Sequence, residues 1–250
     1  MGPHKQNSLH SNKEKAKYLV GISPWVSGAS VSLKDCQSVI GSLQHCTLVI
    51  LDGHSYLSSL FHLASSFKDP SKPFIRHHIP PLVLADISWW RFRLSADWHS
   101  CSISTPSDPL PFSTFVDAST FFGIGFLSDG KWLAWCFADD WKSVGCDIGW
   151  AKMVAIDLGL RTLIHAGFKD CHLVFLSDNQ GVVGTLSSGR YRGPYQNEVL
   201  HHIVFNFCDN NIWLSVRWVD SASNQADPIS CGLLPFSRSH HPCPPLLSSF

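Results

Sequence analysis

The sequence has no excess of charge of either sign, because 19 Lys and Arg residues balance 19 Asp and Glu residues. Domains that bind nucleic acid often carry a strong positive charge, so this balance neither supports nor excludes such a partner. Any surface that binds phosphate must therefore be a local patch.

Other features are also missing. The nine cysteines include no Cys-x-x-Cys pair, and no secretory leader is expected. This pattern favours reduced thiols in an intracellular protein, cytoplasmic or nuclear, over a disulfide framework. Zinc is not expected, although the chain has 14 histidines. No uncharged apolar run approaches the ~18 residues of a membrane-spanning helix, so no membrane partner is expected.

The composition that remains is typical of a globular protein. With 250 residues, of which 44% are apolar and 15% charged, the chain can bury one large core or two modest ones. The sequence pattern changes from helix-like to strand-like near residue 105, in a polar linker with two prolines over residues 102–109. The sequence predicts a basic polar tail over 1–17, a helical segment over 18–105, an α/β domain over 106–234 and a Pro-rich irregular tail over 235–250.

The segment before the linker has the periodicity of helices. Ser32 and Asp35 resemble a capping box at the start of a helix over residues 32–45. Two further apolar stripes recur at helical spacing and predict core-facing helices. Their members are Tyr56, Leu57, Leu60, Phe61 and Ala64 in the first stripe, and Val83, Ile87, Trp90 and Leu94 in the second.

After the linker, short runs of aromatic and branched residues predict strands. Asp129-Gly130 is a tight hairpin signal between two of them. An amphipathic helix is predicted from Ile148 to near Gly167. The predicted strands cover 113–116, 124–127, 132–137, 172–176 and 212–219, and the other helices begin at 179 or cover 197–207 and 222–230. This order predicts an α/β fold with a mixed five-stranded sheet flanked by helices.

Three acids stand out, Asp117 and Asp178 at the ends of apolar runs and Asp227 after Asn224-Gln225-Ala226. If the first and fourth strands are adjacent and parallel, Asp117 and Asp178 meet at the edge of the sheet where ligands collect. Phosphodiester hydrolysis with two divalent ions about 3.5–4 Å apart requires oxygen ligands of this kind. A single Asp at a strand end more often caps a turn. Three acids in this order favour a metal site.

Several stretches also match the pattern of one protein family. They are Val116-Asp117-Ala118-Ser119, Gly123-Ile124-Gly125, Asp147-Ile148-Gly149-Trp150-Ala151, Ser177-Asp178-Asn179-Gln180-Gly181-Val182-Val183-Gly184, Gly189-Arg190, Trp218-Val219-Asp220-Ser221 and residues 224–232. Over residues 112–232 the chain resembles the ribonuclease H domain of a retroelement reverse transcriptase, of the kind found in long-terminal-repeat elements and their fungal relatives. Residues 18–94 resemble, less closely, the helical connection of such proteins, best at Asp86-Ile87-Ser88-Trp89-Trp90.

The resemblance implies a ribonuclease H-like fold and a retrotransposon origin. It also implies Mg²⁺ or Mn²⁺ at Asp117, Asp178 and Asp227, and the RNA strand of an RNA/DNA hybrid as substrate. No polymerase domain is expected, because the residues before Asp117 are predicted to be helical. Nothing in the sequence identifies a protein partner.

Two departures from the family pattern predict a degenerate active site. Lys152 follows Ala151, where the pattern places a catalytic Glu, so a cation replaces a metal ligand. Reversing one charge beside divalent ions weakens metal binding strongly. Asp157 lies about 140° further round the helix and Asp147 precedes it, so neither is a good replacement. The loop over 220–223 also lacks the His that many such ribonucleases carry there.

Two functions therefore stay open. The first is metal-dependent hydrolysis of the RNA strand of RNA/DNA hybrids, weakened or lost because of Lys152. The second is a noncatalytic nucleic-acid or protein-binding module that retains the ribonuclease H fold. Arg190 and Arg192, on either side of Tyr191 in a Gly-rich turn, are candidate contacts to a nucleic-acid backbone, although the turn could equally be an ordinary solvated loop.

Overall fold

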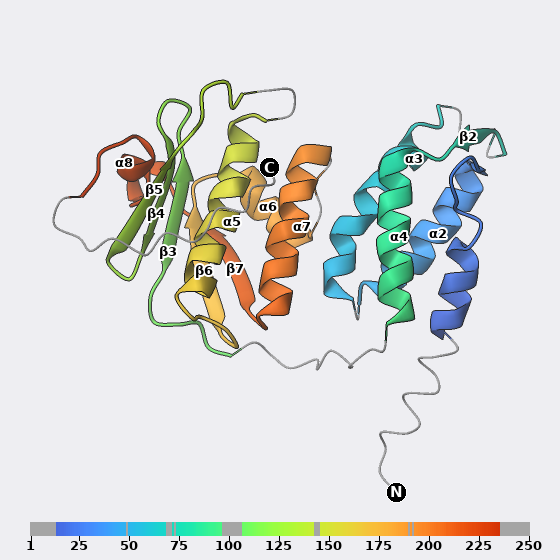
Figure 1. The fold of residues 1–250 in the computed structure, drawn as a ribbon, viewed down its shortest axis with the longest axis horizontal. Helices are drawn as coiled ribbons and strands as arrows, with labels where there is room; N and C mark the ends of the chain where they lie inside the picture. Colours follow the sequence, from blue (N-terminus) through green and yellow to red (C-terminus); the bar gives the residue numbers. More distant parts are fainter. Residues whose placement is uncertain are drawn as a thin grey trace, which may run out of the picture. The chain divides into compact units, whose positions relative to one another are not determined.

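The computed structural model describes residues 14–48, 50–68, 72, 74–96, 107–142, 146–189, 191 and 193–235. The chain divides into two compact units, Met1–Ile103 and Ser104–Phe250, here called unit 1 and unit 2 (Figure 1). Each unit has a hydrophobic core of its own. Among the described residues, no helix is both long enough and apolar enough to cross a bilayer.

Unit 1 consists of helices and one short pair of strands. Its core includes the fully buried Leu43, Leu60, Ile87 and Trp90. The helix over 14–22 begins inside the segment that the sequence assigned to a polar tail. The other elements are β1 (Ser30–Ser32), α2 (Leu33–Cys46), η1 (Leu51–Leu57), α3 (Ser58–Ser65), β2 (Arg76–His78) and α4 (Pro81–Ser95).

The start of α2 follows the predicted capping box. The Ser32 hydroxyl accepts from the Asp35 amide at 3.2 Å, and an Asp35 carboxylate oxygen accepts from the Ser32 amide at 2.9 Å. The next predicted helical stripe begins in the 3₁₀ helix η1, which has a kink at Tyr56 (φ −86°, ψ 20°), and continues in α3. Gly53 in this part allows close approach of Trp90, whose ring a Cβ at that position would overlap.

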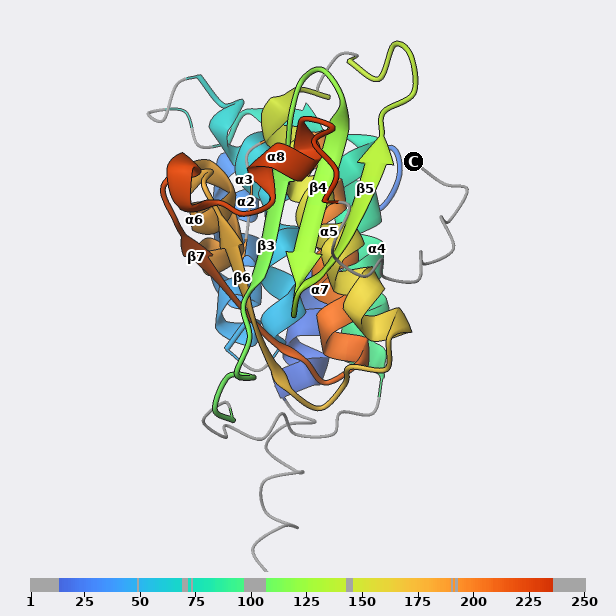
Figure 2. The same ribbon diagram turned by 90° about the vertical axis from the view of Figure 1, so that its left-hand side faces the viewer.

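Unit 2 contains a five-stranded mixed sheet flanked by helices (Figure 2). The strands are β3 (Thr114–Ala118), β4 (Gly123–Ser128), β5 (Lys131–Cys136), β6 (His172–Ser177) and β7 (Trp213–Trp218). Their order is β5-β4-β3-β6-β7, so β3 is central. β4 pairs antiparallel with both β3 and β5. β6 pairs parallel with β3 on one side and with β7 on the other. The mixed sheet and the parallel pairing of its first and fourth strands are thus confirmed.

The hairpin between β4 and β5 has the predicted tight turn. Asp129 and Gly130 have φ of 48° and 72°, both in the left-handed region. A type I′ turn requires positive φ at both central residues, and its twist matches that of the flanking strands. The Asp-Gly pair therefore fixes the register of β4 on β5.

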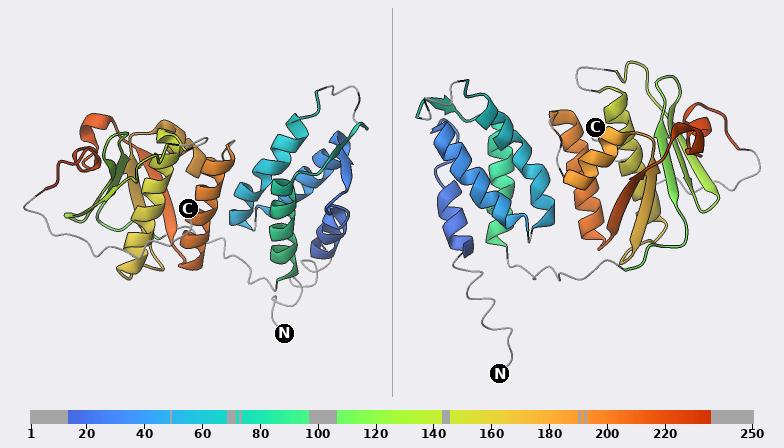
Figure 3. Two further views of the ribbon diagram at one scale, coloured as in Figure 1. Left: turned by 45° about the horizontal axis from the view of Figure 1, so that its top comes forward. Right: turned by 180° about the vertical axis from the view of Figure 1, so that it is seen from behind.

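Helices cover both faces of the sheet. On one face lie α5 (Ile148–His165) and α7 (Pro194–Asp209), while α6 (Gln180–Ser188) follows β6 (Figure 3). Gly159 of α5 lies against the rings of Phe126 and Phe175, which permits close packing of this helix on the sheet. The short α8 (Asp227–Ser230) lies on the other face, where its backbone fills the space beside Gly125 (Figure 2).

The predicted helix over 222–230 is wrong in its extent. The segment forms a 3₁₀ turn, η2 (Ser221–Ser223), and then the one-turn α8. Asp220 caps η2 by accepting from the Ser223 amide at 3.0 Å, and Asn224 then adopts an extended ψ of 100°. The Asn224 side chain accepts from the Ala226 amide at 3.2 Å, and a side chain that bonds the local backbone in this way competes with helix continuation, so the two turns remain separate.

Candidate functional site

Asp117 and Asp178 meet at one edge of the sheet. Asp117 is near the end of β3, and Asp178 directly follows β6. Because these strands are adjacent and parallel, their carboxyl ends lie at the same edge. The side chains are 3% and 8% exposed, so both carboxylates are largely withdrawn from water.

Lys152 of α5 lies between the two carboxylates. Its Nζ is 2.6 Å from Oδ1 of Asp178 and 2.9 Å from Oδ1 of Asp117. The contact with Asp178 is a hydrogen bond, whereas the angle to Asp117 makes that contact an ion pair without a well-directed hydrogen bond. The ammonium group thus bridges one oxygen of each acid.

Two serines engage the remaining carboxylate oxygens. Ser221 of η2 donates to Oδ2 of Asp178 at 2.9 Å, and Ser230 of α8 donates to Oδ2 of Asp117 at 2.7 Å. A continuous polar chain therefore runs from Ser221 through Asp178, Lys152 and Asp117 to Ser230. It connects segments that are far apart in sequence.

Sequence analysis missed both serines. Ser230 occurs one helical turn after Asp227, and Ser221 follows Asp220, but serines in such positions are common in turns. Their role depends on where α8 and η2 lie relative to β3 and β6. No local sequence signal could have identified them.

The charges at this edge shift one another's pKa values. Burial raises the pKa of Asp117 above its usual range, against the opposing effect of Lys152 and Ser230. Burial acts in the same direction on Asp178, but hydrogen bonds from Lys152 and Ser221 outweigh it and lower the pKa of Asp178. Burial disfavours the charged ammonium, yet the two carboxylates raise the pKa of Lys152. The lysine is therefore held in its charged form.

Asp227 reaches this edge through its backbone. It begins α8, and its carbonyl oxygen lies 2.9 Å from Oγ of Ser230, so the single hydroxyl hydrogen of Ser230 is shared between this carbonyl and Asp117. Within the described part of the chain, its half-buried carboxylate makes no hydrogen bond or ion pair. The structure brings the three predicted acids to one region, but only Asp117 and Asp178 share a direct partner.

The residues present at this edge do not fit a divalent ion. A hard cation such as Mg²⁺ requires oxygen ligands, and here Nζ of Lys152 lies between the two inner oxygens while serines bind the outer ones. Among the residues described by the structure, no group of three His, Cys, Asp or Glu side chains is arranged to hold a metal. Lys152 supplies a positive charge where the family pattern expects an acidic ligand.

The two other acids near α5 have structural partners. Asp147 caps α5 by accepting from the Trp150 amide at 2.8 Å. Asp157 is fully buried and forms an ion pair with Arg161 at 2.7 Å, and its other oxygen accepts from Asn206 at 3.1 Å. Neither acid is bonded to the Asp117 and Asp178 pair.

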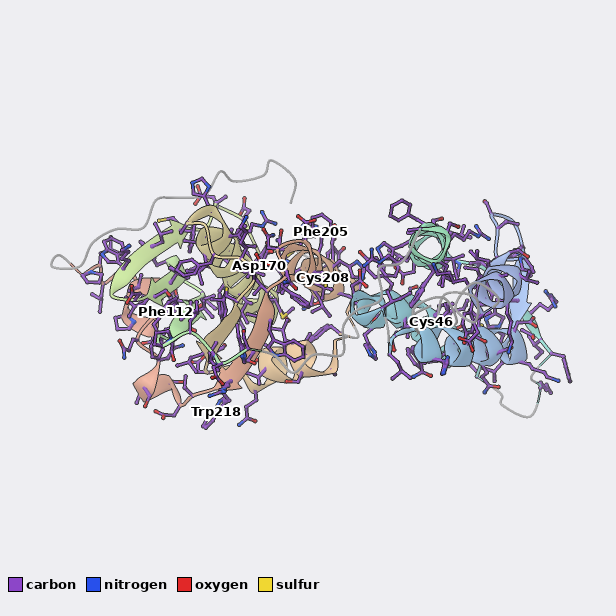
Figure 4. All side chains as sticks on the ribbon, turned by 90° about the horizontal axis from the view of Figure 1, so that it is seen from below. Cys46, Phe112, Asp170, Phe205, Cys208 and Trp218 are labelled. Carbon is purple, nitrogen blue, oxygen red and sulfur yellow. The ribbon has the colours of Figure 1, made fainter. Side chains whose placement is uncertain are left out.

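An aromatic side chain borders the site. Trp218 ends β7, is 49% exposed and projects outward from unit 2 (Figure 4). Its indole Nε1 donates to the carbonyl of Asp178 at 3.1 Å, which fixes the ring beside the acidic edge. The predicted nucleic-acid contacts Arg190 and Arg192 lie outside the described residues.

Comparison with known proteins does not identify the chain. No protein-family model matches it, and no curated protein sequence matches it either.

Proposed function

We propose that unit 2 is a ribonuclease H-like domain derived from a retroelement reverse transcriptase, and that the chain acts as a noncatalytic nucleic-acid-binding module. The order of the sheet supports the first part, since three antiparallel strands are followed by two parallel ones with β3 in the centre. The sequence stretches that resemble the family occur at the ends of β3 and β6 and at the start of α5.

The position of Lys152 supports the absence of catalysis in this proposal. Its ammonium group is within 3 Å of both acids, and its side chain is only 15% exposed. A divalent ion about 4 Å from this group would be repelled by roughly 8 kcal/mol at an effective dielectric near 20. Hydrolysis that depends on two metal ions would have to overcome this repulsion. Loss of hydrolysis follows.

A cleavage assay on an RNA/DNA hybrid tests the loss of activity. We expect no cleavage by the natural chain with Mg²⁺ or Mn²⁺, and cleavage by Lys152→Glu, which supplies the oxygen ligand of the family pattern. The matched control is Lys152→Glu combined with Asp178→Asn, which removes another acid and should be inactive. Robust cleavage by the natural chain that disappears in Asp178→Asn would show the proposal to be wrong.

Binding is measured separately, in the presence of EDTA, by fluorescence anisotropy of labelled hybrid, single-stranded RNA and single-stranded DNA. We expect the natural chain to bind at least one of these without a metal. If it binds none of them, the nucleic-acid part of the proposal is wrong, and a protein-binding module becomes the better description.

A further inference from the structure

The neutral chain is divided into two units of opposite charge. Unit 1 carries ten Lys and Arg residues against six Asp and Glu residues, whereas unit 2 carries nine against thirteen. Their formal charges are therefore +4 and −4. Long-range attraction of a polyanion depends on local positive potential, so it favours unit 1.

The acidic edge of unit 2 is a poor surface for phosphate. Lys152 is fully engaged by Asp117 and Asp178, and Asp227 adds a further negative charge nearby. Without divalent ions, these groups leave a net negative edge that repels a nucleic-acid backbone. If the chain binds nucleic acid as proposed above, the main contact must lie elsewhere.

Unit 1 presents a basic and aromatic rim formed by Lys34, Phe74 and Arg76. Nζ of Lys34, at the start of α2, lies 5.6 Å from the centre of the Phe74 ring, and this ring is 71% exposed. Arg76 begins β2 and is paired in register with Ser32, the residue that caps α2. The two cations therefore lie beside the same helix start.

Arg76 is positioned but not buried. Its guanidinium donates to the Ser30 carbonyl and lies 3.6 Å from an Asp35 carboxylate oxygen, while its side chain remains 59% exposed. An exposed guanidinium with planar donors is well suited to bind phosphate. The contacts to Ser30 and Asp35 reduce the entropy that Arg76 would lose on binding.

A hollow of about 450 Å³ adjoins this rim. Its walls include Trp25, Ser30, Asp35, Ser38 and Arg76. The two hydroxyl groups and the carboxylate provide donors and acceptors for a ligand with a polar edge. Its volume is within the range of small-molecule sites, about 300–1,000 Å³, and is sufficient for a nucleobase.

We propose that this rim and hollow bind single-stranded nucleic acid. Lys34 and Arg76 contact phosphates, Phe74 stacks on an unpaired base, and the hollow receives a neighbouring base. Stacking on an exposed ring requires bases that are not already stacked within a duplex. The contact is therefore specific for unpaired segments, and it rests on the nucleic-acid binding proposed above.

The test measures anisotropy of labelled single-stranded RNA and DNA and of a duplex, over a series of salt concentrations, with the full chain. We expect Lys34→Glu combined with Arg76→Glu to weaken single-strand binding at least tenfold. The slope of log affinity against log salt should fall by about 1.4, because each phosphate contact with a single strand contributes about 0.7. Phe74→Ala should weaken single-strand binding about tenfold while leaving this slope unchanged.

Lys17→Glu is the matched control for Lys34→Glu alone, because each changes the formal charge by two. Lys17 is exposed and belongs to unit 1, and the bond between its neighbour Tyr18 and His45 places it near the other end of α2. Arg76→Lys, which preserves the charge, should retain the salt slope, and circular dichroism confirms that each variant is folded.

The outcomes separate the two proposals. If the natural chain binds none of the nucleic acids, the proposed function fails and this contact fails with it. If the natural chain binds but the rim variants behave like Lys17→Glu, or if the duplex binds more tightly than the single strands, this contact is wrong while the proposed function stands.

Discussion

Lys152 combines two properties that an acidic ligand lacks, a positive charge and hydrogen-bond donors. Near neutral pH the Lys152–Asp178 pair of this bridge is charged, because the pKa of Asp178 is lowered from 3.8 and that of Lys152 is raised from 10.5, whereas burial raises the pKa of Asp117. The bridge contributes stability above the unfolded pKa of Asp178 and below that of Lys152. It is lost as pH falls through the lowered pKa of Asp178.

Replacing Lys152 by Met tests whether the ammonium stabilises this edge. We expect the free energy of unfolding of unit 2 to fall by about 3 kcal/mol at pH 7, because two buried carboxylates lose their common cation. The loss should be smaller at pH 5, where protonation of one carboxylate relieves the repulsion. Thermal and urea unfolding at both pH values measure the effect.

The metal response provides the control. EDTA and Mg²⁺ should leave the unfolding temperature of the natural chain unchanged, since the carboxylates of Asp117 and Asp178 are already engaged by Lys152 and two serines. Lys152→Glu should be destabilised in EDTA and regain stability with millimolar Mg²⁺. An increase in the stability of the natural chain with Mg²⁺ would contradict the role given to Lys152.

At the scale of elements, the sequence predicted most of unit 2 because its signals are local. Short runs of aromatic and branched residues marked β3 to β5, and Asp129-Gly130 marked the hairpin between β4 and β5. A helical stripe from Ile148 marked α5. The adjacency of Asp117 and Asp178 also followed, since it requires only that β3 and β6 pair in parallel.

Elements that depend on distant partners were not predictable. The strands β1 and β2 have three residues each, and they are defined by antiparallel pairing between distant positions, from Ser30 with His78 to Ser32 with Arg76. The position of Lys152 between two acids likewise depends on how α5 packs beside β3 and β6. Such contacts are set by tertiary packing, which local periodicity does not encode.

The packing of α4 against α3 includes a buried acid that makes unit 1 sensitive to pH. Burial raises the pKa of Asp86 from 3.8 to about 6, although hydrogen bonds from Ser59 oppose the shift. Because the folded-state pKa exceeds the unfolded one, the stabilising effect of protonation is present below about pH 4 and is lost as pH rises through 6. The corresponding cost at neutral pH is about 3 kcal/mol.

Asp86→Asn removes this ionisation while preserving an acceptor for the Ser59 hydroxyl. We expect the variant to be more stable than the natural chain at pH 7.5, by up to about 3 kcal/mol, and to match it at pH 4. Urea unfolding across this range measures both. A variant that is less stable than the natural chain at pH 7.5 would rule out the assignment.

At the scale of the whole molecule, the two separate cores predict two unfolding transitions. The buried clusters around Trp90 and Phe126 each consist of residues from one unit. Asp86→Asn should therefore shift one transition and Lys152→Met the other, because each substitution changes contacts inside a single unit. Differential scanning calorimetry at pH 7.5 measures both midpoints, and the double variant should show the sum of the two shifts. A single transition that moves with either substitution would mean that the units unfold together, and then neither core is stable by itself.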